Sequence, residues 1–309
     1  MLNRHLLRIK VFQTIYSFRK SADNNFVAAY SELTKSINES YLLYIHILLF
    51  LIELKQHSET RIEQIQARVV QNETEWKKLV PLSQNSVLTE LEQNKELQQI
   101  IQKEKISWHS HKEIIKELFT YIIESEKYQQ YSESEQTEQQ DKKILKFILE
   151  SVIGKSESFF SFIEEKSIFW NDEIDQIISM VYKTINKLKT EKIILPVFKD
   201  AEAKHFVEKL LTTTIKNWDE YNNYIVERLK NWELERVAET DLIIMHVAIT
   251  EAINFTEIPI RVTLNEYIEI SKKYSTEKSN VFINGLLHKL CKDLEHEKII
   301  VKTGRGLMS

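Results

Sequence analysis

Apolar residues recur at intervals of three and four along most of the chain, which is the spacing of one face of an α-helix. No stretch shows the alternating pattern of a half-buried β-strand strongly enough to compete with it. Near the N-terminus the spaced apolar positions are Leu6, Ile9, Phe12, Ile15 and Tyr16. The pattern predicts an all-α protein.

The helical pattern is clearest in the C-terminal third of the chain. Asp200 stands before an apolar-spaced stretch and is expected to cap a helix. Residues Asp241 to Ile253 are apolar on nearly all sides, which is typical of a central helix. Thr263 and Glu266 have the T-x-x-E spacing of a capping box, so we expect a helix to begin there.

Turn-forming residues are scarce, which supports this fold class. The 309 residues include 4 Gly and 3 Pro, about 2% of the chain, whereas average usage is roughly 12%. A chain so poor in these residues cannot make the many tight corners of a β-sandwich or barrel. The single cysteine excludes an intramolecular disulfide framework and a cysteine-based zinc finger.

Two segments have unusual composition. Residues Tyr41 to Ile52 are apolar except for His46, but a membrane span needs about 20 such residues, so we expect a buried helix. The N-terminus has no continuous apolar signal region, which favours a cytoplasmic protein. Residues Gln129 to Gln140 are almost wholly polar and predict a solvated linker whose deletion leaves folding nearly unchanged.

The sequence has no pattern of residues typical of an active site. It contains no glycine-rich phosphate loop and no H-E-x-x-H metal motif. Cys291 has leucines at helical spacing around it, which favours a core residue over a nucleophile. We therefore predict no catalytic residue, no cofactor and no metal site, and a protein that is not an enzyme.

The N-terminal helix is the first candidate for a binding surface. The net charge of −4 means that any nucleic-acid site must be local, and the first twenty residues hold no Asp or Glu. Arg4 and Arg8 are four residues apart and share a face, His5 lies beside them, and Gln13 follows about two turns on. Such a face suits phosphate contacts, but from charge alone an ordinary solvated helix face explains it equally well.

The second candidate is the polar turn before the last helix, residues 275–280. Lys278 and Asn280 lie in this turn and Phe282 follows it. An exposed phenylalanine beside them would stack a single-stranded base. Spacing alone instead favours an inward-packed Phe282, in line with Ile283 and Leu286.

Four segments together resemble the NusB family of transcription antitermination factors, and they cover about a third of the chain, at its two ends. They are RHLLRIKVFQTIYSF (Arg4 to Phe18), KHFVEKLLTTTIKNWDEYNNYI (Lys204 to Ile225), NWELERVAETDLIIMHVAITEAI (Asn231 to Ile253) and IPIRVTLNEYIEISKKYSTEKSNVFINGLLHKL (Ile258 to Leu290). The middle resembles the long NusB variant of Bacteroidota, in segments such as YIHILLFLIEL and LPVFKD.

The resemblance implies an all-helical protein with two packed helical subdomains. It implies binding of boxA leader RNA together with the ribosomal protein NusE, in support of an RNA polymerase that transcribes ribosomal RNA operons. In family terms the residues that face RNA would be Arg4, Arg8, Gln13, Lys278 and Phe282, and the residues that face NusE would be Tyr16 and Asp241. The chain departs from the family at His5 and Leu6, where further basic residues are usual, and at Lys278, where an acid is common.

The expected organisation is a basic helix at residues 1–21, a large helical insertion at 22–200, a NusB-like subdomain at 201–295 and a tail at 296–309. The competing interpretation is a helical scaffold, or a dimeric interaction module, without specific RNA binding. NusB-like domains also occur fused to RNA methyltransferases, but the four glycines and one cysteine cannot supply such a catalytic domain.

Overall fold

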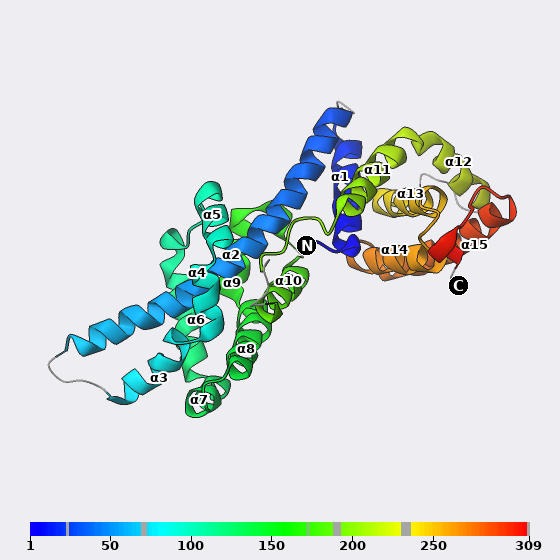
Figure 1. Ribbon diagram of the computed structural model, residues 1–309. Helices are drawn as coiled ribbons and strands as arrows, with labels where there is room; N and C mark the ends of the chain where they lie inside the picture. The colour runs from blue at the N-terminus through cyan, green and yellow to red at the C-terminus, as the bar shows by residue number, and fades with distance from the viewer. Residues whose placement is uncertain (23–24, 69–72, 172, 188–192, 230–235, 308–309) are drawn as a thin grey trace. The chain divides into compact units, whose positions relative to one another are not determined.

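The protein is described by a computed structural model covering residues 1–22, 25–68, 73–171, 173–187, 193–229 and 236–307. Throughout these ranges the regular structure is helical, and no β-strand occurs in them (Figure 1). The all-α prediction is therefore confirmed.

The chain divides into two compact units. The terminal unit comprises Leu2–Ile37 and Phe198–Ser309, and the middle unit comprises Met1 and Asn38–Val197. The first boundary between the units falls after Ile37, whereas the sequence suggested that the N-terminal segment ends at residue 21. The reason is that the first turns of helix α2 (Phe26–Gln66) belong to the terminal unit.

The middle unit is built around the remainder of α2. Leu43, Phe50 and Leu54 are fully buried there. The ring of His46 packs against that of Trp170, with ring centres 4.9 Å apart. α2 is long and apolar enough to cross a membrane, but 72% of its most apolar window is buried, which fits the predicted core helix. The other helices of this unit are α3 (Glu73–Ser83), α4 (Ser86–Gln93), α5 (Lys95–Glu104), η1 (His109–His111), α6 (Lys112–Glu124), α7 (Glu126–Glu133), α8 (Glu138–Phe147), the π-helix η2 (Ile148–Val152), η3 (Ile153–Lys155), α9 (Glu157–Lys166), η4 (Ile168–Trp170) and α10 (Ile174–Asn186).

The prediction of a solvated linker at residues 129–140 is wrong. Most of this stretch is helical, in α7 and the start of α8, and the two helices pack together. Tyr131 is buried and its hydroxyl donates a 2.6 Å hydrogen bond to Asp141. Two buried tyrosines three positions apart, Tyr128 and Tyr131, hold this otherwise polar helix against the core.

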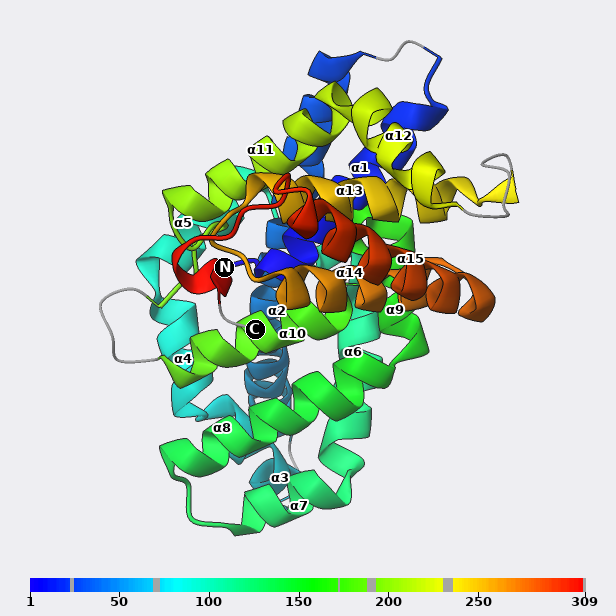
Figure 2. The same ribbon diagram turned by 90° about the vertical axis from the view of Figure 1, so that its right-hand side faces the viewer.

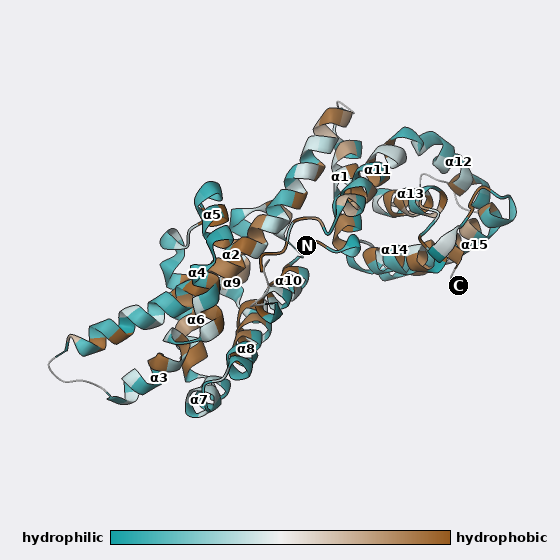
Figure 3. Ribbon diagram, viewed as in Figure 1, coloured by the Kyte–Doolittle hydropathy of each residue, from teal (hydrophilic) through white to brown (hydrophobic). Residues whose placement is uncertain are grey.

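The terminal unit packs several helices around α1 (Arg4–Lys20). α1 contacts α11 and α13, and the side chain of Asn3 caps its first turn. Figure 2 shows α1 among these helices, and Figure 3 shows the hydrophobic bands of α13 and the mostly hydrophilic α12. The unit's other helices are α11 (Ala201–Lys216), α12 (Trp218–Arg228), α13 (Glu239–Asn254), α14 (Ile260–Tyr274), α15 (Glu277–His296) and η6 (Gly304–Leu307).

Two of the three C-terminal expectations are confirmed. Asp200 caps α11 by accepting a hydrogen bond from the amide of Ala203, and α13 is buried over most of its length. The capping box is wrong, because α14 begins at Ile260 and carries Thr263 and Glu266 inside the helix. Their side chains contact Glu251 and His5 instead, as described below.

The tail folds back on the end of α13. The Lys302 ammonium donates to the carbonyl oxygens of Ala252 and Phe255, at 2.7 and 3.1 Å, and so satisfies acceptors that a helix end leaves free. The amide of Thr303 donates to the Thr256 carbonyl at 3.0 Å. Gly306 lies so close to this turn that an added Cβ would be 1.9 Å from the Thr256 oxygen.

Candidate nucleic-acid interface

Ion pairs define how α1 lies in the terminal unit. Arg8 pairs with Glu251 and Lys20 with Glu239, so α1 runs antiparallel to α13. His5 contacts Glu266, and Gln13 contacts Tyr274, so α1 runs parallel to α14. Residues 6–12 of α1 are all buried, whereas Tyr16, Arg19 and Lys20 towards its end are exposed.

Arg8 is buried, and the expectation that it shares an exposed face with Arg4 is wrong. Only 2% of Arg8 is exposed, and its guanidinium donates two hydrogen bonds to Glu251, of 2.7 and 2.9 Å. Thr263 and Tyr267 donate to the same carboxylate at 2.9 and 3.2 Å. Burial alone would lower the pKa of Arg8, but Glu251 outweighs it and raises that pKa above its ordinary value. Arg8 is therefore a charged core residue that joins α1 to α13.

The other basic groups at the start of α1 are also neutralised by acids from later helices. Arg4 pairs with Glu202 of α11, and its guanidinium lies 5.2 Å from the centre of the Phe206 ring. His5 lies 2.7 Å from Glu266. Burial would raise the pKa of Glu266, but His5 and Arg8 lower it, so this carboxylate stays ionised. The local positive field is thus weaker than the acid-free stretch of sequence suggested.

Gln13 brings the two candidate surfaces together. Its side-chain amide donates a 3.2 Å hydrogen bond to the hydroxyl of Tyr274, the last residue of α14. The Tyr274 ring also packs against Phe12, with ring centres 5.0 Å apart. The N-terminal helix and the turn that precedes α15 therefore meet at one place on the terminal unit.

The expected turn at 275–280 is shorter than the sequence suggested. α15 begins at Glu277, and the Thr276 side chain caps it by accepting from the amide of Ser279. Lys278 is exposed in the first turn, whereas Asn280 is half-buried and accepts a 3.0 Å hydrogen bond from Ser271. Phe282 is also half-buried, so it is neither a fully packed core residue nor a free aromatic platform.

The two residues expected to face a protein partner differ from each other. Tyr16 is 38% exposed and lies beside the ammonium of Lys20, at 5.7 Å. Asp241 is only 3% exposed and accepts a hydrogen bond from Ser275, so the expectation that it lies on an exposed surface is wrong. Asp241 instead ties the start of α13 to the turn between α14 and α15.

Sequence reasoning missed Lys273 and Tyr274. Lys273 is exposed, and its ammonium lies 5.7 Å from the centre of the Tyr274 ring. The sequence signal for these two residues was a lysine pair followed by a tyrosine at the end of a predicted helix, shortly before Lys278. These residues add positive charge and aromatic surface beside Gln13.

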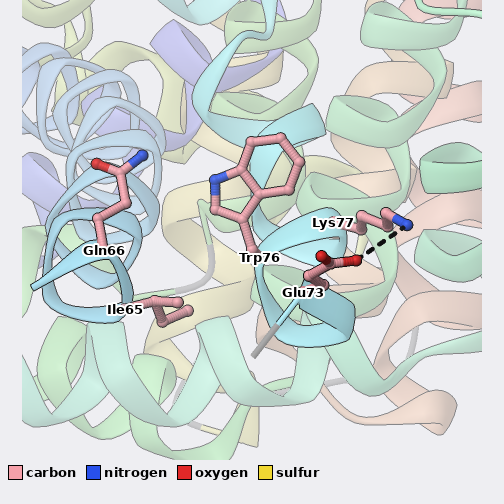
Figure 4. Close-up of a pocket in the computed structure, with 5 residues that line it drawn as sticks. All are labelled: Ile65, Gln66, Glu73, Trp76 and Lys77. Atoms are coloured by element: carbon pink, nitrogen blue, oxygen red, sulfur yellow. Dashed lines mark ion pairs between the residues drawn. The ribbon is translucent and has the colours of Figure 1, made fainter. Parts of the chain in front are cut away.

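Features that would indicate catalysis are weak in the part of the chain that the structure describes. No group of three or more His, Cys, Asp or Glu side chains is placed to hold a metal ion there. A hollow in the middle unit is lined by Ile65, Gln66 and Trp76 and by Glu73 and Lys77, which form a 3.9 Å ion pair (Figure 4). Cys291 is buried, and burial raises the pKa of its thiol to about 12, which disfavours the reactive thiolate.

Comparison with known proteins identifies the family. The sequence profile of the NusB family matches residues 176–292. The chain is 37% identical over 114 residues to the transcription antitermination protein NusB of Salinibacter ruber, a match that covers 37% of this chain and 71% of the relative. The chain belongs to the NusB family.

Two further NusB relatives agree. The chain is 36% identical to the protein of Chloroherpeton thalassium, with 40% of this chain and 61% of the relative covered. It is also 36% identical to the protein of Natranaerobius thermophilus, with 29% of this chain and 64% of the relative covered. The chain thus spans less than two thirds of the length of these two relatives.

The match to the NusB family profile includes α11 to α14 and most of α15, but not α1. Residues 231–235 of the NusB-like segment that starts at Asn231 lie outside the described residues. A solved NusB of T. maritima is 23% identical, with 49% of this chain and 91% of that chain covered, at a TM-score of 0.30. The family assignment therefore rests on the sequence relatives.

Proposed function

We propose that this NusB-family chain is a non-catalytic, cytoplasmic transcription antitermination factor that binds boxA-type leader RNA together with the ribosomal protein NusE. In this role it would join the RNA polymerase antitermination complex on ribosomal RNA operons. The named relatives are transcription antitermination proteins. The RNA and the partner come from the family resemblance and remain part of the proposal.

One observation carries the proposal: the hydrogen bond between Gln13 and Tyr274 joins α1 to the α14–α15 turn. The resulting surface combines exposed ammonium groups on Lys273 and Lys278 with the half-buried ring of Phe282. Positive charge beside aromatic rings and an amide is the composition that single-stranded RNA sites use. Arg4 and His5 lie along α1 and, being partly exposed, remain candidates for its edge, as does Asn280.

The decisive experiment measures binding of a boxA RNA and a scrambled RNA to the full chain over a range of salt concentrations. Lys278→Gln removes one exposed charge, so the log–log salt slope should become shallower by about 0.7. Lys292→Gln is the matched control, because Lys292 is exposed on the same helix but nearer its other end. Equal binding of the two RNAs by the wild type would sink the proposal and favour the scaffold interpretation.

Phe282→Ala tests the aromatic contribution separately. Loss of a stacking ring costs about 1–3 kcal/mol of binding free energy, and the salt slope should not change because no charge is removed. Because Phe282 is half-buried, thermal melts of the variant must accompany the titrations. A folded variant that binds boxA RNA as the wild type does would remove Phe282 from the site.

The alternative of a scaffold or homodimer without specific RNA binding is tested by the same samples. Sedimentation of the chain alone, with NusE and with RNA gives the stoichiometry of each species. The proposal expects one chain, one NusE and one RNA in the complex. A stable dimer with equal affinity for all RNAs would favour the alternative.

A further inference from the structure

A second surface groove lies in the middle unit, where α7 and α8 pack side by side. Its volume is about 520 Å³, within the range of sites that hold small molecules or parts of larger ligands. Both ribbon views show α7 and α8 as neighbours (Figures 1 and 2). The groove belongs to one unit and contains none of the residues discussed for the candidate interface.

The charge of the groove is positive although the whole chain is acidic. Lys127, Lys143 and Lys146 line it, against the single carboxylate of Glu150. Lys146 lies 3.8 Å from Glu150, whereas Lys127 and Lys143 make no ion pair with any residue that the structure describes. Two ammonium groups therefore remain to attract an anion.

The groove also offers apolar and amide surface. Tyr131 and Ile144 are buried, Phe147 is half-buried, and all three contribute to its lining. Gln130 and Gln140 supply amide groups, each of which can both donate and accept hydrogen bonds. Lysines combined with aromatic and amide groups suit a ligand that carries phosphates and planar bases.

The length of the groove favours a chain over a single ion. Its lining runs from Gln140 to Ser151 along α8 and the π-helix η2, roughly 16 Å at 1.5 Å per residue. η2 places Glu150 and Ser151 at one end, and single π-helical turns occur frequently at functional sites.

We propose that the groove between α7 and α8 binds a short stretch of single-stranded RNA. The phosphates lie against Lys127, Lys143 and Lys146, and a base lies against the half-buried ring of Phe147. This second site stands independently of the boxA surface, since the two use different residues and different units.

Lysine reactivity, read by mass spectrometry on the full chain, gives a local test. An oligouridylate should protect Lys127 and Lys143 from an amine-reactive label, while Lys103, exposed on α5, should stay reactive. Inorganic polyphosphate and uridine monophosphate, at matched phosphate concentration, are the comparison ligands. Equal protection by polyphosphate would overturn the role of the bases, and equal protection by the mononucleotide would overturn the choice of a chain.

Variants complete the test. The double substitution Lys127→Gln with Lys143→Gln should weaken oligouridylate binding and make the salt slope shallower by about 1.4, two contacts at 0.7 each. Lys103→Gln with Lys116→Gln removes the same charge from exposed positions on α5 and α6 and should change neither. Glu150→Gln should strengthen binding, because Lys146 loses its acidic neighbour.

The outcome separates the two proposals. Lys278→Gln should leave the protection of Lys127 and Lys143 intact, whether or not it weakens boxA binding. Unchanged affinity and slope in the folded Lys127→Gln, Lys143→Gln variant would overturn the second site and leave the boxA proposal standing.

Discussion

At the scale of single residues, the charges of α1 have roles that sequence position alone could not predict. Arg4 and Arg8 share a helical face, yet Arg8 is in the core and Arg4 is partly exposed. The acids that neutralise them lie 198 and 243 residues away in the sequence, on α11 and α13. Spacing predicts which residues share a face, but only the folded unit shows what packs against that face.

Arg8→Ala should destabilise the protein strongly, because it leaves the buried carboxylate of Glu251 without its cation. Breaking one side of a buried ion pair costs about 3–5 kcal/mol of unfolding free energy. Arg4→Ala is the matched control on the same helix, and its partly exposed pair should contribute less than about 1 kcal/mol. Urea denaturation monitored by circular dichroism measures both; similar losses for the two variants would contradict this assignment.

Two buried histidines should make the terminal and middle units sensitive to acid. His246 is fully buried, stacks on Trp218 at 3.6 Å, and neither of its ring nitrogens has a hydrogen-bond partner. Burial, with a smaller contribution from Arg19, lowers the pKa of His246 to about 3. Burial likewise lowers the pKa of His46 to about 4.

The sign of the pH dependence follows from these pKa values. An unfolded histidine titrates near 6.5, so below that pH the unfolded state binds more protons than the folded state. The contribution of His246 is complete above about pH 6.5 and is lost as the pH falls towards 3, by at most about 1.4 kcal/mol per pH unit.

His246→Phe should therefore flatten the loss of unfolding free energy between pH 7 and 5, while keeping an aromatic partner for Trp218. Denaturation curves at several pH values measure the effect. His288→Phe serves as the control because His288 is exposed. An unchanged acid dependence in the His246 variant would mean that this histidine is charged in the folded protein.

At the scale of elements, the periodicity of apolar residues predicted the helices well and their ends less well. The strong stripes of α11 and α13, and the cap at Asp200, match the sequence. The T-x-x-E spacing failed at Thr263 because both side chains bind partners on other helices. The prediction of a solvated linker at 129–140 failed because it rested on the number of polar residues, whereas the buried Tyr131 holds the segment in place.

Tyr131→Phe should destabilise the α7–α8 pair. The Tyr131 hydroxyl donates to Asp141 and accepts a 3.2 Å hydrogen bond from Asn85, and both partners are buried. Removing the hydroxyl leaves these groups short of a partner, at a cost of about 1–3 kcal/mol. Gln129→Ala, at an exposed position of the same helix, should change stability by less than about 0.5 kcal/mol. A thermal melt of each variant measures the difference, and equal melting temperatures would show that the Tyr131 hydroxyl does not stabilise this helix pair.

Gly306→Ala should loosen the tail, because its Cβ would overlap the Thr256 carbonyl oxygen, a backbone atom that cannot swing aside. Gly285→Ala is the matched control in α15, where nothing lies within 4 Å of the added Cβ. In a helix that change should stabilise by roughly 0.5–1 kcal/mol. Hydrogen exchange at the Thr303 amide, which bonds to Thr256, reports the tail directly. Slow exchange in the Gly306 variant would show that the tail accommodates the methyl group.

At the scale of the whole molecule, the sequence predicted the fold class and the family correctly, and the RNA interface stays a prediction. Gln13 and Lys278 are 265 residues apart in the sequence, yet Gln13 contacts Tyr274, four residues before Lys278. The family resemblance anticipated that meeting; periodicity and charge did not. Asp241 and Arg8 could not be assigned correctly, because burial and cross-helix partners are set by packing.

The proposed RNA and NusE surfaces predict thermodynamic coupling between the two ligands. Tyr16 is exposed on α1, one turn beyond Gln13, so a protein bound there would order the same helix that meets the RNA surface. If NusE raises the affinity for boxA RNA by some factor, RNA must raise the affinity for NusE by the same factor, because linkage is reciprocal. A typical coupling of about 1–3 kcal/mol corresponds to roughly a 5- to 150-fold change.

Titration calorimetry measures the coupling by comparing RNA binding with and without NusE, and NusE binding with and without RNA. Tyr16→Ala should weaken NusE binding and leave the RNA affinity of the free chain intact. Lys278→Gln should do the reverse, since its charge lies on the RNA side. Each variant therefore disables one binding step and leaves the other as its internal control, and scrambled RNA should show no coupling. Identical RNA affinity with and without NusE would disprove the coupling, even if both ligands bind. Loss of both affinities in Tyr16→Ala would instead mean that the residue supports α1 itself.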